Sequence, residues 1–323
     1  MTASADGATS DSQTITINIT GANDAARDLA LTAVSSYANG NGMPGAGAQI
    51  GQISVPTGAD PDGGGAYSYS LVSAKVGALA ATAISTDAAS QFSLDFTSGV
   101  LSTSATGGLV QGSIYELTVQ VAQGTGAAEA TYSETFSIVT GTNSGETLPG
   151  SSGFNFSTGD DVIYGRNNND FIYAGSGNDT AFGQGGDDEI HGGTGVDILY
   201  GGNDDDAFVF ASGDTGITLA TADTIADFTT ADDVISTSLP TGNVTIANGS
   251  GLINFDAFLS AANAVLAQGA GTNDAYMAWN AAGSGNGWLL IDENDSGIVD
   301  VGDTLIVLTG VNLANEFSTT DIA

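Results

Sequence analysis

The sequence contains no cysteine, so neither a disulfide nor a thiolate can stabilise this protein or take part in its chemistry. Positive charge is almost as scarce, since three Lys+Arg residues stand against 37 Asp+Glu residues and give a formal net charge of −34. Such an acidic surface disfavours nucleic acid and anionic membranes as partners. It also calls for cations to offset the repulsion between carboxylates.

Long hydrophobic runs are also missing. No segment approaches the roughly 18 consecutive apolar residues that a membrane-spanning helix requires. The first twelve residues, MTASADGATSDS, have neither the basic start nor the apolar stretch of a classical signal peptide. We therefore expect no membrane span and no classical export signal.

Residues suited to catalysis are equally scarce. His191 is the only histidine, and its place in the chain predicts a side chain on the outer surface of a strand. HExxH, GxSxG and a phosphate-binding glycine loop before a helix are all absent from the sequence. We therefore predict no catalytic residue and no enzymatic activity.

What the sequence does contain is a repeat. Six consecutive nonapeptides share one frame from residue 156 to residue 209, with an apolar residue at position eight and glycine frequent at positions one, two and four. Glycine adopts left-handed backbone conformations readily, so each copy predicts a tight turn followed by a three-residue strand with position eight inside. Position six is aspartate in every copy: Asp161, Asp170, Asp179, Asp188, Asp197 and Asp206.

Two nonapeptides complete one coil, so each turn should stack on the turn two copies away. Carboxylates brought that close repel each other unless a cation lies between them, and calcium accepts six to eight oxygen ligands in flexible geometry. We expect the weakest site at the N-terminal end, where Phe156 and Ser157 replace the leading glycines. The predicted pairs are Asp161 with Asp179, Asp170 with Asp188, Asp179 with Asp197, and Asp188 with Asp206.

The segment from about Gly145 to Phe210 resembles the calcium-binding parallel β-roll of the RTX (repeats-in-toxin) family. The resemblance implies several bound calcium ions. The stretch from Asp214 to Ala323 is similar to the C-terminal regions of RTX proteins of the type I secretion class, which carry an uncleaved C-terminal signal. The likeness implies recognition by type I secretion machinery and a place outside the cell or on the surface of a Gram-negative bacterium.

A second candidate calcium site is the stretch DENDSGIVDVGD (292 to 303), which has the ligand spacing of an EF-hand-type loop. Its flanks are strand-like, so we predict a calcium loop in a β setting. An acidic hairpin without metal is the alternative. The candidate ligands are Asp292, Asn294, Ser296, Asp300 and Asp303, with Gly297 at the turn.

Between the repeat and this loop, INFDAFLSAANAVLAQG predicts one core-packing helix, which Asn254 caps and Gly269 ends. Just after the repeat, residues 223 to 236 predict strands and turns because apolar and acidic residues alternate there.

N-terminal to the repeat, short alternating strands bounded by Gly, Asp and Pro predict a β-sandwich. Residues 28 to 142 resemble a bacterial cadherin-like repeat. Asp60 and Asp62 lie where that family has an acidic turn, and calcium binding by this domain is left open. The overall prediction is a mainly β chain: sandwich, parallel roll, then a mostly β module with one helix.

Two apolar surfaces lack an obvious partner. Residues 14 to 20 form a strand with three isoleucines on one face, which predicts donation to a neighbouring subunit and head-to-tail self-assembly; a stub left from a longer protein is the alternative. Tyr164, Phe182 and Tyr200 should line the outer face of one side of the roll. We expect the C-terminal module or another subunit to cover them.

The predicted units are residues 1–24, a strand and linker; 25–143, the sandwich; 144–213, the roll; and 214–323, the C-terminal module. The favoured function is a secreted, calcium-binding structural protein of the cell surface or extracellular matrix, as a filament, surface-layer or adhesin subunit. One alternative is the secretion and folding tail of a larger RTX protease or lipase. The other is a module that binds carbohydrate or a cell-surface ligand.

Overall fold

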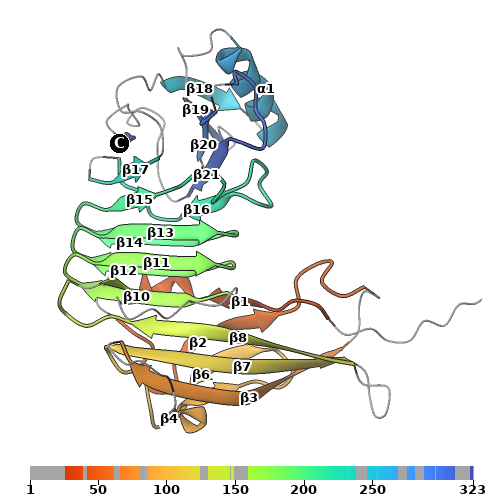
Figure 1. Cartoon of the computed structure of the whole chain (residues 1–323), viewed down its shortest axis with the longest axis vertical. Coiled ribbons are helices and arrows are strands. Elements are labelled where there is room, and N and C mark those ends of the chain that lie inside the picture. The colour runs from red at the N-terminus through yellow and green to blue at the C-terminus, as the bar shows by residue number, and fades with distance from the viewer. Residues whose placement is uncertain are drawn as a thin grey trace, which may run out of the picture.

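Two facing β-sheets form the N-terminal part of the computed structural model (Figure 1), as the alternating sequence predicts. Leu101 of the first sheet and Phe136 of the second are both fully buried in the core between them. The first sheet contains β1 (Ala30–Ala33), β2 (Gln49–Ser54), β6 (Val100–Thr103) and β5 (Phe92–Leu94). The facing strands are β4 (Thr86–Asp87), β3 (Tyr67–Ala78), β7 (Ser113–Gln123) and β8 (Ala130–Thr140).

The structure describes most of the chain from residue 26 onward. The described residues are 26–38, 42–61, 66–79, 84, 86–123, 130–145, 147–148, 159–230, 232–237, 246–252, 254–267, 275–280, 287–294, 296–309 and 321–322. The predicted donor strand (14 to 20), Asp62 and most of the predicted secretion signal lie outside these ranges.

The repeat folds into a parallel β-roll whose copies alternate between two sheets. Val162 aligns with Thr180 and Phe171 with Glu189, so stacked strands are two copies apart, as predicted. The odd copies contribute β10 (Val162–Asn167), β12 (Thr180–Gly185) and β14 (Ile198–Asn203). The even copies contribute β11 (Phe171–Ser176), β13 (Glu189–Thr194) and β15 (Ala207–Val209).

Most of these strands have six residues, so the predicted length of three was wrong. Each continues from the end of one copy into the first three positions of the next. The extension is possible because the next copy opens with glycine or another residue that lets the stacked backbones approach closely. A Cβ added to Gly165, for example, would lie 2.7 Å from the carbonyl oxygen of Gly183 on the neighbouring strand.

The side chains at position eight fill the interior of the roll. All six are fully buried and belong to one hydrophobic cluster, so this prediction is confirmed. They are Ile163, Ile172, Ala181, Ile190, Leu199 and Phe208.

The sheets of the roll continue into the modules on either side of it. Strand β10 pairs in parallel with β8 of the sandwich, and β14 pairs with β16 (Asp223–Ile225), which pairs with β21 (Thr304–Leu308). In the other sheet, β11 pairs with β9 (Thr147–Leu148) and β15 with β17 (Val234–Ser236). One hydrophobic cluster therefore runs from Val139 in the sandwich through the roll to Met277 beyond it.

The C-terminal module is mostly β with one helix, as predicted, and the helix packs on the end of the sheet that contains β16 and β21. Helix α1 (Phe255–Leu266) begins where the Asn254 side chain accepts a hydrogen bond from the backbone of Ala257 at 2.8 Å, and Phe258 is fully buried. The sheet adds β18 (Ile246–Leu252), β19 (Ala275–Asn280) and β20 (Gly287–Ile291). Within the described ranges, no helix combines the length and hydrophobicity needed to cross a bilayer.

The outer face of the odd sheet is covered, but not by the element we expected. Tyr164 and Phe182 are fully buried, and the ring of Tyr37 meets Tyr164 edge to face with centroids 5.9 Å apart. The amide of Gln184 donates to the carbonyl oxygens of Tyr37 at 2.6 Å and Gly42 at 2.9 Å. The segment around η1 (Ser35–Tyr37) of the sandwich therefore covers this face. It follows β1 in the chain, and β1 lies beside the roll (Figure 1).

Candidate metal centre

The predicted aspartates form two columns, one on each side of the roll, and each column is joined by hydrogen bonds. The odd column consists of Asp161, Asp179 and Asp197, from the first, third and fifth copies. The backbone N–H of Asp161 donates to Oδ1 of Asp179 at 2.7 Å, and that of Asp179 donates to Oδ1 of Asp197 at 2.8 Å. Ser137 of β8 donates to Oδ1 of Asp161 at 2.8 Å. The column is therefore anchored on the sandwich.

The even column repeats this arrangement. The N–H of Asp170 donates to Oδ1 of Asp188 at 2.8 Å, and that of Asp188 donates to Oδ1 of Asp206 at 2.9 Å. All four predicted pairs are thus neighbours in the structure. They meet through a carboxylate and a backbone N–H, and not as two carboxylates alone.

Two aspartates that the repeat pattern missed extend these columns. The N–H of Asp197 donates to Asp223 at 2.8 Å, and the N–H of Asp206 donates to Asp233 at 3.1 Å. Both follow spacers longer than the 18 residues between stacked copies, 26 for Asp223 and 27 for Asp233, and the nine-residue frame is interrupted by Thr215 and Thr224. The signal that could have found them is the local pattern of Asp, any residue, then aliphatic, which ends at Ile225 and Ile235 as it does at Ile163.

The second carboxylate oxygen is the feature that fits a cation. This oxygen is buried and accepts no hydrogen bond within the described part of the chain, and an ionised carboxylate in that state is costly unless it is paired or binds a metal. The oxygens concerned are Oδ2 of Asp161, Asp179, Asp188, Asp197, Asp206 and Asp223.

Glycine at position one makes room for these oxygens. A Cβ added to Gly192 would lie 2.3 Å from Oδ2 of Asp197, and one added to Gly201 would lie 2.3 Å from Oδ2 of Asp206. No real Cβ tolerates so short a contact. The glycine and the aspartate of one copy are therefore linked by packing as well as by the turn.

Burial raises the pKa of these carboxyls far above the usual range for aspartate. Desolvation is the largest cause throughout, and it raises the pKa of Asp179 to about 9 with added repulsion from Asp161 and Asp197. Asp206 also rises to about 9, and Asp188 to about 7. Without a cation, therefore, the folded roll favours protonated carboxyls.

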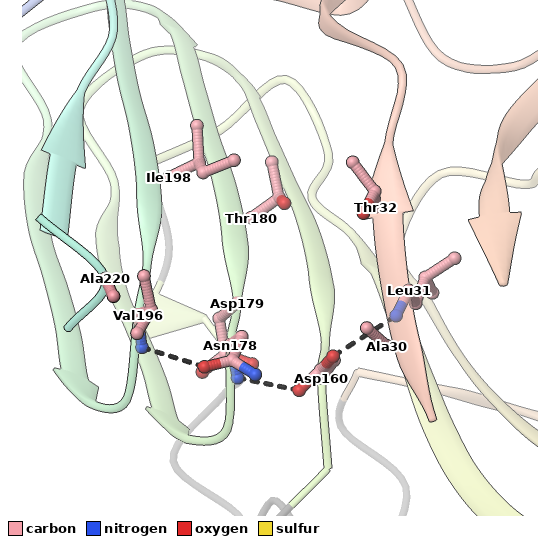
Figure 2. Close-up of a pocket in the computed structure, with 10 residues that line it drawn as sticks. All are labelled: Ala30, Leu31, Thr32, Asp160, Asn178, Asp179, Thr180, Val196, Ile198 and Ala220. Carbon is pink, nitrogen blue, oxygen red and sulfur yellow. Dashed lines mark hydrogen bonds between the residues drawn. The ribbon is translucent and has the colours of Figure 1, made fainter. Parts of the chain in front are cut away.

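Position five forms a further set of hydrogen bonds beside the odd column (Figure 2). The N–H of Asn178 donates to Oδ1 of Asp160 at 2.7 Å, and that of Val196 donates to Oδ1 of Asn178 at 3.0 Å. The other oxygen of Asp160 accepts the N–H of Leu31 in β1 at 3.2 Å. These residues line a cavity of about 290 Å³ that also borders Asp179, where the sandwich meets the roll.

Within the described ranges, no group of three or more acidic or histidine side chains gathers at one point. A calcium ion in the roll would therefore take one or two carboxylates, with the remaining oxygens coming from backbone carbonyls and water, which calcium accepts. The glycine-rich turns expose such carbonyls, because no side chain covers them.

The loop from 292 to 303 joins β20 to β21, so its predicted β setting is confirmed. The backbone N–H groups of Ser296 and Gly297 donate to the carboxylate of Asp292 at 3.0 and 2.8 Å, and Asn294 donates to Oδ1 of Asp300 at 2.8 Å. Oδ1 of Asp303 is buried and accepts no hydrogen bond from the described residues. The loop thus satisfies Asp292 and Oδ1 of Asp300 by hydrogen bonds within it and leaves one oxygen of Asp303 without a partner among the described residues.

Two other candidates have ordinary structural roles. The carboxylate of Asp60 accepts hydrogen bonds from the Tyr67 hydroxyl at 2.6 Å and the Gln123 amide at 2.8 Å, which suits a local hydrogen-bond acceptor. His191 lies on the outer face of the even sheet, as predicted, where it bonds Glu189 at 2.8 Å and stacks on Tyr173.

Comparison with protein families supports the assignment of the repeat. Residues 157–181 and 182–217 match the model for the RTX calcium-binding nonapeptide repeat (4 copies). The roll consists of RTX calcium-binding repeats. These repeats bind calcium ions, so calcium is the cofactor of this protein, and RTX repeat proteins are typically extracellular. Such repeats are non-catalytic modules.

Among solved structures, the chain is similar to the AlgE6R3 subunit from the Azotobacter vinelandii mannuronan C5-epimerase, determined in solution. The two share 24% sequence identity with a TM-score of 0.35, over 51% of this chain and 78% of that one. Comparison with curated protein sequences gives no match.

Proposed function

We propose that this protein is a secreted structural component of the bacterial cell surface or extracellular matrix that folds when it meets calcium outside the cell. The observation that carries the proposal is the set of buried aspartate oxygens without a hydrogen-bond partner in the described residues. Ionised at neutral pH, they oppose folding where calcium is scarce. Calcium binding in such sites contributes its free energy directly to folding.

A bound calcium ion would supply positive charge and accept oxygen ligands, and the residues of the roll position those ligands. Oδ1 of the six aspartates with an unpartnered Oδ2 accepts a backbone N–H, which orients the carboxylate. Gly192 and Gly201 leave space beside Oδ2 of Asp197 and of Asp206. The position-eight side chains exclude water from the interior. Only the charge on Oδ2 then needs an external partner.

Calcium-dependent folding also suits export by type I secretion machinery, which we propose as the route. A roll kept unfolded by its own charge at cytosolic calcium would remain competent for passage as an extended chain. It would then fold in the calcium-rich medium outside.

The experiment is circular dichroism during removal of calcium with EGTA at pH 7.5. We expect strand signal from the roll to be lost as calcium is removed and to return when calcium is added back. An equal concentration of magnesium is the control, since magnesium demands a stricter geometry and gives up its water reluctantly. Strand signal that persists unchanged without calcium would refute the proposal.

We further propose the loop from 292 to 303 as a separate calcium site, because Asp303 is buried with one oxygen lacking a partner among the described residues. The Asp303→Asn variant should lose calcium from this loop and keep the calcium of the roll. Asp232→Asn, which removes an exposed charge elsewhere, is the matched control. Unchanged calcium binding by Asp303→Asn would show an acidic hairpin without metal.

Self-assembly through residues 14 to 20 is the third part of the proposal, supported by the alternating pattern of that stretch. Burial of each isoleucine would contribute roughly 1.5–3 kcal/mol before ordering costs. Deletion of residues 1 to 22 should leave a folded, calcium-binding monomer. Electron microscopy with calcium should then show assemblies for the full chain only; identical assemblies from the truncated chain would exclude strand donation.

A further inference from the structure

Asp223 lies beyond the last nonapeptide, yet its backbone repeats the geometry of the roll. Thr224 aligns with Ile198 and Ile225 with Leu199 in the parallel pairing of β14 and β16. The N–H of Thr224 donates to the carbonyl oxygen of Asp197 at 2.8 Å. The equivalent bond one coil earlier, from Ile198 to Asp179, measures 2.9 Å. Residues 223 to 225 are therefore a further turn of the odd column, although 26 residues and not 18 separate Asp223 from Asp197.

The side chain of Asp223 also repeats the pattern of the roll. Its Oδ1 accepts the N–H of Asp197 at 2.8 Å, and its Oδ2 accepts no hydrogen bond from the described residues. The residue is fully buried. No calcium-binding repeat covers it, because the match to the repeat model ends at residue 217.

The C-terminal module holds Asp223 in this position. The backbone N–H of Asp223 donates to Oγ1 of Thr215 at 2.8 Å, and the Thr215 hydroxyl donates to the carbonyl oxygen of Leu305 at 2.9 Å. Strand β16 pairs with β21, which contains Leu305. The carboxylate thus lies where the roll joins the C-terminal module, within the electrostatic reach of Asp214.

Asp233, at the matching place in the even column, differs in one decisive respect. Its Oδ1 accepts the N–H of Asp206 at 3.1 Å, and its Oδ2 accepts the N–H of Thr229 at 2.7 Å. Both oxygens therefore have backbone donors. Asp233 closes its column by hydrogen bonding alone, whereas Asp223 has an oxygen left over.

We propose that Asp223 is a ligand of a calcium ion outside the repeats, bound at the junction of the roll and the C-terminal module, and that Asp233 binds none. This inference rests on the proposed calcium-dependent folding. The inference adds to that proposal one calcium site beyond the repeats, at the end of the odd column and not of the even column. The ion would couple the order of the C-terminal module to the calcium that folds the roll.

The test is calcium stoichiometry, measured by equilibrium dialysis against calcium chloride with atomic absorption. The Asp223→Asn variant keeps an oxygen for the Asp197 N–H and replaces Oδ2 by an amide nitrogen. We expect it to bind one ion fewer per chain than the wild type. Asp233→Asn should keep the full number of ions and melt at a lower temperature, because it loses an acceptor. Asp232→Asn, with the same change in net charge at an exposed side chain, should match the wild type in both.

Each outcome decides the question. A full set of ions in Asp223→Asn, or an equal loss in Asp233→Asn, would overturn the inference. If Asp223→Asn does not fold in saturating calcium, Asp223→Ser offers a second variant with one oxygen. Failure of both to fold would make Asp223 a hydrogen-bonding residue like Asp233. A wild type that folds without calcium would contradict the proposed function itself, which separates that failure from this one.

Discussion

Six column aspartates combine an oxygen that accepts a backbone N–H with one that has no hydrogen-bond partner in the described residues: Asp161, Asp179, Asp188, Asp197, Asp206 and Asp223. Oδ1 of Asp197, for example, accepts the N–H of Asp179, while its Oδ2 is buried beside Gly192. Breaking the first contact removes a hydrogen bond; neutralising the second relieves a buried charge. The two oxygens of one carboxylate can therefore be tested separately.

Acid should partly replace calcium. Unfolded aspartate has a pKa near 3.9, whereas burial raises the pKa of Asp188 to about 7 and of Asp206 to about 9 in the fold. The folded, calcium-free chain thus binds more protons than the unfolded chain between about pH 4 and 9, and its free energy of unfolding falls as pH rises through that window. Circular dichroism in calcium-free buffer should therefore show more strand signal from the roll at pH 5 than at pH 8.

Saturating calcium is the control for this prediction, because a bound ion keeps the carboxylates ionised. The decline from pH 5 to pH 8 should then disappear. A calcium-free protein with as much strand signal at pH 8 as at pH 5 would mean that these carboxyls are not buried as charged groups.

Replacing Asp161 should cost as much as replacing an aspartate in the middle of a column. The Asp161→Ala change leaves the buried N–H of Ser137 without its acceptor, which costs about 1–3 kcal/mol. Asp188→Ala does the same to Asp170. Urea denaturation in saturating calcium should give similar losses for both and a much smaller loss for the exposed Asp205→Ala. A negligible effect of Asp161→Ala would instead support the expectation, based on the missing glycines, that the N-terminal calcium site is the weakest.

At the scale of the elements, the turns carry strict steric requirements. Position four adopts a left-handed backbone in both glycine and its substitutes, with φ of 144° at Gly195, 70° at Asn168 and 75° at Asp204. Asparagine and aspartate tolerate this region better than other residues with a side chain. The substitutions at position four therefore follow backbone conformation.

Gly195→Ala should be strongly destabilising. Its Cβ would lie 1.7 Å from the carbonyl oxygen of Gly177, and its φ of 144° is unfavourable for alanine. We expect a loss of about 1–3 kcal/mol from backbone strain and a similar loss from the collision. The measurement is the urea midpoint in calcium. Gly45→Ala, where an added Cβ meets nothing within 4 Å, should change the midpoint little, and equal effects would contradict the turn geometry.

The segment around η1 should stabilise the odd sheet through Tyr37. The Tyr37→Ala change removes an edge-to-face contact with Tyr164, a pair that contributes about 0.5–1.5 kcal/mol beyond burial. Hydrogen exchange should then speed up at the amides of β10 and β12. Tyr173→Ala, on the exposed outer face of the even sheet, should leave those amides protected. Unchanged exchange in Tyr37→Ala would mean that the segment covers the sheet without stabilising it.

At the scale of the whole molecule, sandwich, roll and C-terminal module share strands and core. The twelve-stranded sheet passes through all three, and one cluster of buried side chains joins Val139, Ile190 and Met277. The sandwich and the helix also have clusters of their own, but the cluster inside the roll includes Ile114 and Val139 of the sandwich and Met277 of the C-terminal module. The first and last turns of the roll each rest on a flanking module.

Calorimetry in saturating calcium should therefore show one cooperative unfolding transition for the three parts. Shared strands and core make partial unfolding expose apolar surface on the remaining part, which raises its cost. Well-resolved transitions, with the sandwich melting independently of calcium, would show that the shared sheet does not couple the modules.

The sequence by itself determined the roll, its coil of two copies, its buried position eight and its calcium. It did so because a strict period makes one local conformation repeat. The residue types at each position indicate that conformation, with glycine in the turn and an apolar side chain inside. The helix from Asn254 was also readable, since a cap and an apolar face are local features.

Tertiary structure decided what is not periodic. Only the fold shows that η1 covers Tyr164, that Ser137 holds Asp161, and that Asp223 and Asp233 continue the two columns. The first two contacts join residues far apart in the chain, which no local pattern encodes. Asp223 and Asp233 stand in the local pattern of Asp, any residue, then aliphatic, but only the fold shows which aspartates they stack on. They depend on where whole sheets meet, which is a matter of packing and not of period.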